Sequence, residues 1–346
     1  MKKILILLIL TFMLSCGVQK QIIDTNPDSI EKVVQNTEEV EGEISESEIK
    51  KEIIVKEHIK LNDVKLSLEY LASDALEGRN TGSKGIEKAA IYIENVFKEN
   101  NIKPYFETYR DTFNVKAIIG YNMVGYIEGT DSNLKNEFVI LGAHYDHIGT
   151  AKAVNGDGIA NGANDDASGT VAVLEWAKYF SKTKSNKRSV LFTLYSAEEM
   201  GLKGSGHLAK RLKKENLDVY TMINFEMIGV PRADGETMAY ITGYKLSNMA
   251  EKLNTYANTE MIGFLPQAKA YNLFERSDNY PFYKLFKVPA QAISTFDFTN
   301  FDYYHHVDDE ASEIDFNHMT NFMNKMIPAL EGMINTTSKE IKMYNE

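Results

Sequence analysis

Nitrogen and oxygen donors gather directly after four apolar runs of this sequence. The runs are EFVILGA (137–143), SVLFTLY (189–195), TMINF (221–225) and PAQAIST (289–295), and the donors that follow them are His144, Asp146, His147, Glu198, Glu199, Glu226, His305 and His306. Glu198 and Glu199 are adjacent, and two like charges at the edge of a core repel each other unless a positive charge neutralises one of them. A divalent cation would supply that charge. The pattern therefore predicts a metal site in which one glutamate is a ligand and the other remains a base.

The available donors narrow the choice of metal. Cys16 is the only cysteine and lies near the N-terminus, so thiolates cannot form a metal site in the rest of the chain. Imidazole and carboxylate donors suit zinc, or else manganese or cobalt. A fifth stretch, NGANDDASGT, adds Asp165 and Asp166 just ahead of a helix. Capping that helix would account for one aspartate but not for the gathered histidines and glutamates.

The elements that must position these donors alternate along the chain. The four apolar runs have the length and continuous hydrophobicity of buried strands, and helical periodicity covers residues 85–100, 167–180, 204–215 and 316–334, with Ser83 a candidate N-cap of the first helix. This order predicts an α/β fold with three layers, in which helices cover both faces of a mostly parallel sheet. Because the carboxyl ends of parallel strands share one edge, the donors would meet there.

The N-terminal region predicts export from the cytoplasm. Residues 1–16 comprise a charged start, an apolar run too short to span a membrane, and Cys16, a pattern that resembles a lipoprotein signal peptide. We expect a protein lipidated on Cys16 and anchored to the outer membrane or held in the periplasm. The alternative is a secreted protein with an ordinary signal peptide. Residues 17–60 have the composition of a flexible acidic tether, or else of a propeptide, and residues 61–346 form the expected domain.

Composition limits the class of partner. The chain of 346 residues has a formal net charge of −11, which argues against nucleic acid or anionic lipid as the main partner. A membrane is then expected to contact the protein only through the lipid on Cys16.

Six motifs, taken in order, resemble the co-catalytic di-zinc aminopeptidase family, which comprises bacterial secreted and lipoprotein zinc exopeptidases related to glutaminyl cyclases. They are LGAHYDHIG, NGANDDASGT, YSAEEMGLKGS, INFEMIG, ERSDNYPF and DYYHHVDDE. The resemblance runs from LASDALEGRNTGSKG to YYHHVDDE and covers nearly the whole expected domain. It implies a phosphorylase/hydrolase-like zinc peptidase architecture, peptide substrates and two zinc ions in each chain.

The resemblance also assigns roles to residues. It implies that Glu198 is the general base, that Tyr304 stabilises the developing oxyanion, and that Asp146 orients a ligand imidazole. The implied metal ligands are His144, Asp165 as the bridging carboxylate, Glu199, Glu226 and His305. A cis peptide bond is expected between Asp165 and Asp166. At position 226 the family has aspartate, so the longer glutamate changes the spacing at the first zinc or the choice of metal.

Several alternatives stay open. The chain could be a glutaminyl cyclase with a single zinc, a carboxypeptidase, or a peptide-binding lipoprotein without activity. His306 could replace His305 as a ligand, and His147 is expected outside the ligand set or at the surface. Asp278 would line the substrate cleft or cap a helix. The segment EGRNTG is expected to form a loop that caps the helix at 84–100, or else to touch the pocket, and no lid domain is expected ahead of EFVILGA.

Overall fold

A computed structural model describes residues 58–344 of the chain. The expected signal peptide, Cys16 and residues 17–57 of the expected tether lie outside the described residues. Residues 58 and 59 already contact the domain, because their backbone N–H groups donate to Asn324 Oδ1 over 2.9 and 3.0 Å. Within the described part of the chain, no helix is long and apolar enough to cross a membrane.

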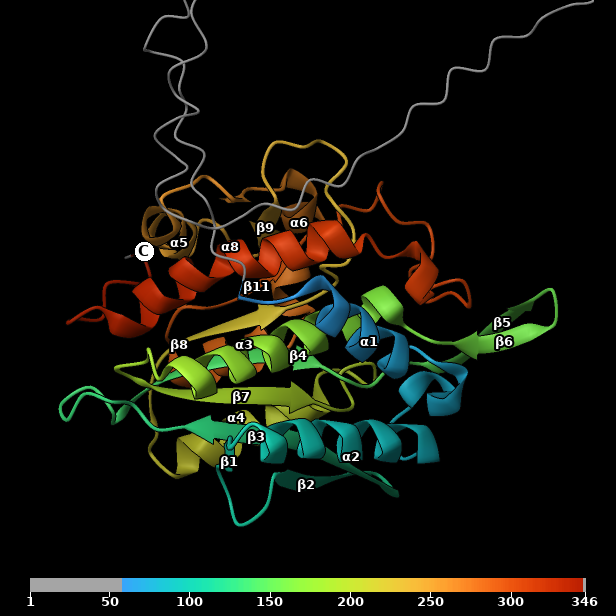
Figure 1. Ribbon diagram of the computed structural model, residues 1–346, viewed down its shortest axis with the longest axis horizontal. Coiled ribbons are helices and arrows are strands. Elements are labelled where there is room, and N and C mark those ends of the chain that lie inside the picture. Colours follow the sequence, from blue (N-terminus) through green and yellow to red (C-terminus); the bar gives the residue numbers. More distant parts are fainter. Residues whose placement is uncertain (1–57, 345–346) are drawn as a thin grey trace, which may run out of the picture. The chain divides into compact units, whose positions relative to one another are not determined.

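A nine-stranded mixed sheet forms the centre of the domain (Figure 1). Its strand order is β1-β3-β7-β4-β8-β11-β9-β10, and β2 pairs with β3. The strands are β1 (Lys103–Pro104), β2 (Arg110–Val115), β3 (Ile118–Ile127), β4 (Glu137–His144), β7 (Ser189–Tyr195), β8 (Asp218–Phe225), β9 (Ala239–Ile241), β10 (Ile262–Gly263) and β11 (Ala290–Ser294).

The four strands predicted from apolar runs are the four central ones. β7, β4, β8 and β11 are neighbours and run parallel to one another, as expected. The outer strands were not predicted, and most of them reverse direction: β3 is antiparallel to β7, and β9 is antiparallel to β11. The predicted mostly parallel sheet is therefore confirmed for its centre.

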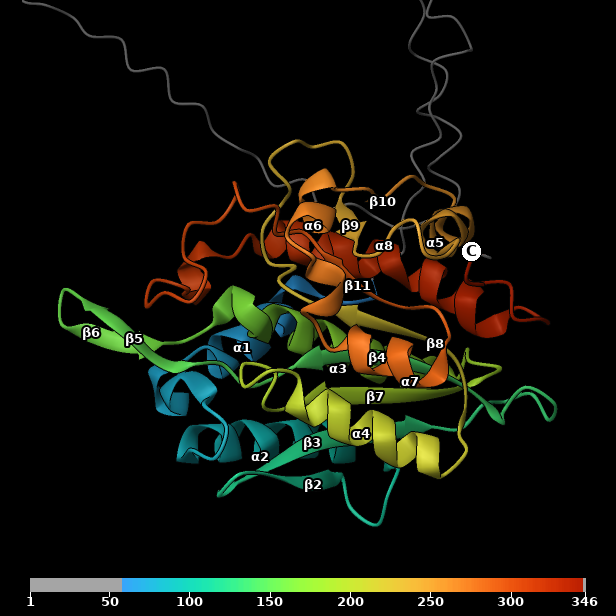
Figure 2. The same ribbon diagram turned by 180° about the vertical axis from the view of Figure 1, so that it is seen from behind.

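Helices cover both faces of this sheet (Figures 1 and 2). One face carries α1 (Leu61–Leu71), α2 (Lys84–Glu99), α3 (Gly169–Thr183) and α8 (Phe316–Asn335), and the other carries α4 (Lys203–Lys214) and α7 (Asn279–Phe286). α5 (Met249–Ala257) packs on α8, and α6 (Pro266–Ala270) follows β10. Ser83 caps α2 as predicted, since its Oγ accepts the N–H of Ile86 over 3.2 Å. The three-layer prediction is confirmed.

The core follows from the alternation of side chains along each strand. In β4, Val139 and Leu141 join the buried cluster beneath α3, while Ile140 joins the cluster beneath α4 and α7. All three side chains are fully buried. A strand buried on both faces needs a continuous apolar run, which is why EFVILGA could be recognised from sequence.

A two-stranded hairpin stands apart from the main sheet. β5 (Gly149–Val154) and β6 (Asp157–Ala160) project from the domain (Figures 1 and 2). Its base lies against the 3₁₀ turn η2 (Asp74–Arg79), where a Cβ on Gly78 would come within 2.4 Å of the Ala160 carbonyl oxygen. Gly78 has φ +65°, so only glycine fits this contact easily. Residues 128–136 join β3 to β4 directly, and no lid domain stands there, as expected.

Candidate metal centre

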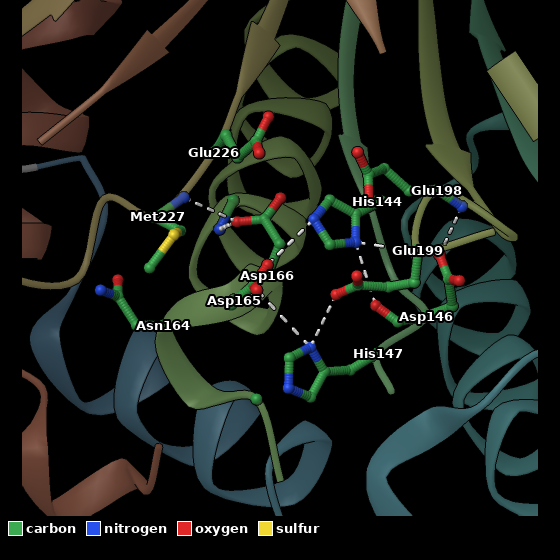
Figure 3. A network of polar contacts seen from close by, with 12 residues as sticks. His144, Asp146, His147, Asn164, Asp165, Asp166, Glu198, Glu199, Glu226 and Met227 are labelled. Carbon is green, nitrogen blue, oxygen red and sulfur yellow. Dashed lines mark hydrogen bonds and ion pairs between the residues drawn. The ribbon is translucent and has the colours of Figure 1, made fainter. Parts of the chain in front are cut away.

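The expected donors lie at the carboxyl edge of the parallel strands. β4 ends at His144, Glu226 follows β8 directly, and Glu198 and Glu199 lie in the loop after β7. His305 lies in the longer loop after β11, and Asp165 lies in the turn η3 (Ala163–Ser168) that precedes α3, where its own backbone angles are not helical. Figure 3 shows His144, Asp165 and Glu199 pointing toward one another. These donors come from five separate segments, four of which follow the parallel strands β4, β7, β8 and β11.

Asp165 lies between two imidazoles. Its Oδ1 is 3.2 Å from Nε2 of His144, and its Oδ2 is 3.3 Å from Nε2 of His305. The same nitrogen of His305 is 3.1 Å from Oε2 of Glu199. One carboxylate facing two imidazoles through its two oxygens is the arrangement expected of a ligand that bridges two cations.

The donor atoms fit divalent cations. Nε2 of His144 and Oδ2 of Asp165 are buried and make no hydrogen bond, although each has a possible partner within 3.3 Å. Such orphaned atoms are costly unless they bind something else. Within the described residues, His144, Glu198 and Glu199 form one group of donors within 4.8 Å of one another, and His147, Asp165 and Glu199 form a second. Nitrogen and oxygen ligands in such groups suit zinc.

Glu226 stands outside both groups. It lines the same cleft as Asp165, Glu198 and Glu199, and its Oε2 accepts a long hydrogen bond from Asn224 Nδ2 at 3.4 Å. In Figure 3 no contact joins it to the other labelled side chains. Glu226, at the position where the resemblance implies aspartate, is therefore also the least tightly connected donor of the centre.

The adjacent glutamates have different protonation equilibria. Burial raises the pKa of Glu198 well above its ordinary value, and the charges of Glu226 and Asp278 add to this rise while His144 opposes it. Burial acts in the same direction on Glu199, but the adjacent imidazoles of His147 and His305 hold its pKa below the ordinary value. Glu199 is thus a carboxylate suited to bind a cation, whereas Glu198 is suited to accept a proton.

Asp146 acts through both its backbone and its side chain. Nδ1 of His144 donates to the main-chain oxygen of Asp146 over 3.0 Å, which leaves Nε2 as the free lone pair of the ring. The carboxylate is farther from that nitrogen, at 3.8 Å, and instead accepts the N–H of Glu198 and the hydroxyl of Thr81. The side chain that was expected to orient His144 mainly holds the Glu198 loop.

Arg79 and Thr81 make hydrogen bonds to the backbone of the segments that carry the donors. The sequence did not assign this role to either residue. Arg79 is 1% exposed and donates to the carbonyl oxygens of Leu71 (2.5 Å), Tyr145 (2.8 Å), Asn161 (2.6 Å) and Gly162 (2.9 Å). Its guanidinium thereby joins α1 to the two segments that carry the histidine and aspartate donors. Thr81 Oγ1 accepts the N–H of Ala197, one residue before Glu198. EGRNTG is therefore more than the expected capping loop.

Further carboxylates shape the loop around Asp165. Its peptide bond to Asp166 is cis, as the resemblance implies. Asp166 Oδ1 accepts the N–H groups of Gly169 and Met227, each over 3.0 Å. Asp309 accepts the N–H groups of Asn164 (2.7 Å) and Asp165 (3.1 Å). Asp309 is part of the DYYHHVDDE motif, but its role depends on backbone contacts that no sequence spacing reveals.

A cleft of about 620 Å³ empty volume opens beside the donors. Four carboxylates of the centre line the cleft, and the remaining wall combines Arg276 and several hydroxyl groups with the apolar and aromatic side chains of Met227, Leu273, Phe296, Phe298 and Tyr304. The Tyr304 ring is 42% exposed and stacks on Phe296 and His305, with centroid distances of 5.8 and 4.0 Å. Tyr304 therefore lies where a substrate bound to the donors would contact it.

Other candidate residues lie elsewhere. Nδ1 of His306 accepts the N–H of Asp308 over 3.1 Å, so its ring faces its own loop rather than the donors. Asp278 is fully buried at the N-cap position of α7, but it makes no capping hydrogen bond and does not line the cleft. His207 lies on α4 with its side chain 38% exposed, and its Nε2 is 3.3 Å from Asp111 Oδ1.

Comparison with known proteins points to one family. The model of peptidase family M28 matches residues 122–330. A probable leucine aminopeptidase of Trichophyton verrucosum is 31% identical over 208 residues, covering 58% of this chain and 52% of that protein. A probable zinc metalloprotease of Pyrenophora tritici-repentis is 33% identical over 115 residues, covering 33% of this chain and 26% of that protein. This chain thus spans about half the length of that leucine aminopeptidase, and less of the metalloprotease.

Solved structures share the fold. The LapA aminopeptidase of Legionella pneumophila superposes with a TM-score of 0.63 at 21% identity, covering 82% of this chain and 74% of that chain. A glutaminyl cyclase of Fimbriiglobus ruber gives a TM-score of 0.62 at 17% identity, covering 80% of this chain and 94% of that chain. The similarity extends to both enzyme classes, so fold alone does not distinguish them.

Proposed function

Because this chain belongs to peptidase family M28, we propose that it is a zinc aminopeptidase that removes N-terminal residues from peptides with two zinc ions. The observation that carries the proposal is the Asp165 carboxylate, which faces His144 through one oxygen and His305 through the other. His144, Asp165 and Glu226 would hold the first ion, and Asp165, Glu199 and His305 the second. A probable leucine aminopeptidase among the relatives supports the same activity.

The protein's own residues divide the remaining work. When bound, the two ions would lower the pKa of a shared water and polarise the peptide carbonyl. Glu198 takes the proton from the attacking water and returns it to the leaving amine, and its raised pKa suits this exchange. The hydroxyl of Tyr304 donates a hydrogen bond to the oxygen that becomes negatively charged. The apolar and aromatic side chains of the cleft wall receive the side chain of the N-terminal residue.

The second candidate is a glutaminyl cyclase with one zinc ion, which the shared fold and the less connected Glu226 favour. The position of Trp176 argues for the peptidase, because the resemblance implies a tryptophan in a loop of the pocket for a glutaminyl cyclase. It is the only tryptophan of the chain and lies buried in α3, where its Nε1 donates to the carbonyl of Met323 over 3.1 Å. Tryptophan is therefore not part of the cleft. Cyclisation of peptides with N-terminal glutamine, without hydrolysis, would reverse this preference.

Export remains a proposal that rests on residues 1–16. We propose that the chain is a lipoprotein anchored through Cys16 outside the cytoplasm. Incorporation of labelled fatty acid into the wild-type chain, and its loss in Cys16→Ser, would support this. Recovery of wild-type protein only from the soluble extracellular fraction would instead support the secreted alternative.

The Glu198→Gln variant tests the aminopeptidase proposal. Loss of a positioned base lowers a proton-transfer rate by about 10²–10⁴-fold, so hydrolysis of aminoacyl amides should fall by that factor while two zinc ions per chain are retained. Glu251→Gln, at an exposed position of α5, is the matched control and should keep wild-type activity. Wild-type protein that binds fewer than two zinc ions per chain and hydrolyses neither peptides nor amides would refute the aminopeptidase proposal and favour the peptide-binding alternative.

A further inference from the structure

A third imidazole enters the metal centre from a position outside the proposed ligands. Nδ1 of His147 is 3.1 Å from Oε1 of Glu199 and 3.7 Å from Oδ2 of Asp165, and the ring is fully buried. We propose that His147 is a positioning residue, whose Nδ1–H binds one oxygen of Glu199 so that the other oxygen faces the second metal ion. This inference rests on the proposed two-metal centre and adds a residue to it.

The geometry separates His147 from the two ligand histidines. The contacts of His144 and His305 with Asp165 join close atoms that are not hydrogen bonded, as expected of two ligands that share a cation. The contact between His147 Nδ1 and Glu199 Oε1 does have the geometry of a hydrogen bond. A nitrogen that points its hydrogen at a carboxylate oxygen has no lone pair for a metal. Nδ1 of His147 is therefore a donor to a ligand rather than a ligand. Its Nε2 is buried and makes no hydrogen bond within the described residues, but it points away from the other labelled donors (Figure 3).

Glu199 has two oxygens with different neighbours. Oε2 lies 3.1 Å from the ligand nitrogen of His305, whereas Oε1 lies 3.1 Å from Nδ1 of His147. A carboxylate on a flexible side chain can rotate and bind a metal through either oxygen or both. A hydrogen bond to Oε1 removes that freedom and leaves Oε2 for the cation. Partners of this kind commonly change metal affinity by about 10–100-fold.

Three neighbours fix the orientation of the His147 ring. A Cβ on Gly162 would come within 2.6 Å of the ring carbon Cγ, so the ring packs directly on the Gly162 backbone. The main-chain N–H of His147 donates to the carbonyl of Arg79 over 3.4 Å. On the other side, the ring of His305 contacts it edge-on at a centroid distance of 5.6 Å. The ring therefore cannot turn without moving the backbone on which Asp165 lies.

The test uses three variants of His147 and measures zinc affinity rather than turnover. An asparagine side chain places its N–H group near the position of the histidine Nδ1, and glutamine places it farther out. Weaker binding of the second zinc by about 10–100-fold is expected in His147→Ala, with recovery to within a few-fold of wild type in His147→Asn but not in His147→Gln. The measurement is competition with a chromophoric chelator, after circular dichroism has verified that each variant is folded.

The outcomes are distinct. Affinity equal to wild type in His147→Ala would overturn the inference. A loss in His147→Ala that asparagine does not restore would also overturn it, because it would make His147 a direct ligand or a packing residue. Wild-type protein that binds no second zinc would instead refute the two-metal function on which this inference rests. If His147→Ala does not fold, the comparison of His147→Asn with His147→Gln still tests the positioning role. Only His147→Asn should bind the second zinc to within a few-fold of the wild-type affinity.

Discussion

Replacing Arg79 by methionine should destabilise the domain strongly, although Arg79 has no direct ion pair within the described residues. Its guanidinium satisfies four carbonyl groups, and those of Leu71, Tyr145 and Asn161 have no other hydrogen-bond donor within the described part of the chain. Methionine has a similar length but no donor, so the substitution leaves three buried carbonyls unpaired.

The expected magnitude follows from these three groups. Each buried acceptor left without a partner costs about 1–3 kcal/mol, or about 3–9 kcal/mol for three. Part of this is recovered, because methionine is easily desolvated and a charged guanidinium is not. A net loss of about 3–5 kcal/mol is expected, which lowers the melting temperature by about 6–10 °C in a domain of this size.

Urea unfolding measures this loss, with the fluorescence of Trp176 as a probe of the buried core. Lys210→Met removes a positive charge from an exposed position of α4 and should change stability by less than about 0.5 kcal/mol. Arg79→Lys should fall between the two, because ammonium keeps the charge but has fewer donors. An Arg79→Met variant as stable as Lys210→Met would refute the reasoning. It would show that water molecules donate hydrogen bonds to these three carbonyl groups in the variant.

Three further predictions concern stability. Arg110 binds both oxygens of Glu87 (2.8 and 2.9 Å), and this hydrogen bonding lowers the pKa of the partly exposed Glu87. Its stabilising effect is thus present above the unfolded pKa of about 4.3 and is lost as the pH falls through the folded value. The difference in melting temperature between wild type and Glu87→Gln should therefore shrink below about pH 4, and a constant difference across pH would contradict this. Ser83→Ala removes the cap of α2 and should cost about 1 kcal/mol in urea unfolding, and no measurable loss would show that the cap is dispensable. Chelation should lower the melting temperature reversibly, since free zinc at about 1,000 times Kd adds about 4 kcal/mol, and calorimetry that shows no change would argue against a resident metal.

The sequence predicted the centre of the molecule better than its margins. The four central strands are buried on both faces and therefore have continuous apolar sequences, and the donors that follow them had to meet at one edge. β9 and β10 have only three and two residues, too few for a periodic pattern. These short strands exist because the edges of the sheet need pairing, which is a tertiary effect.

The supporting residues of the site were missed for a different reason. Arg79 acts on main-chain carbonyl groups, and Asp309 acts on main-chain N–H groups, so neither contact depends on the type of the partner residue. Sequence spacing can reveal groups of side chains that share a chemistry. It cannot reveal a side chain whose partners are backbone atoms of distant segments, because those atoms are the same at every position.

The origin of the donors in five separate segments has a consequence for biogenesis. If the proposed zinc ions bind, they cannot nucleate folding as they do in small zinc-binding modules, because the proposed ligands come from five separate segments of the described residues. The sheet must assemble first, and the newly made protein must pass through a folded, metal-free form. Loading is then a late maturation step, whose rate depends on how much zinc is available in the compartment where the chain completes its folding.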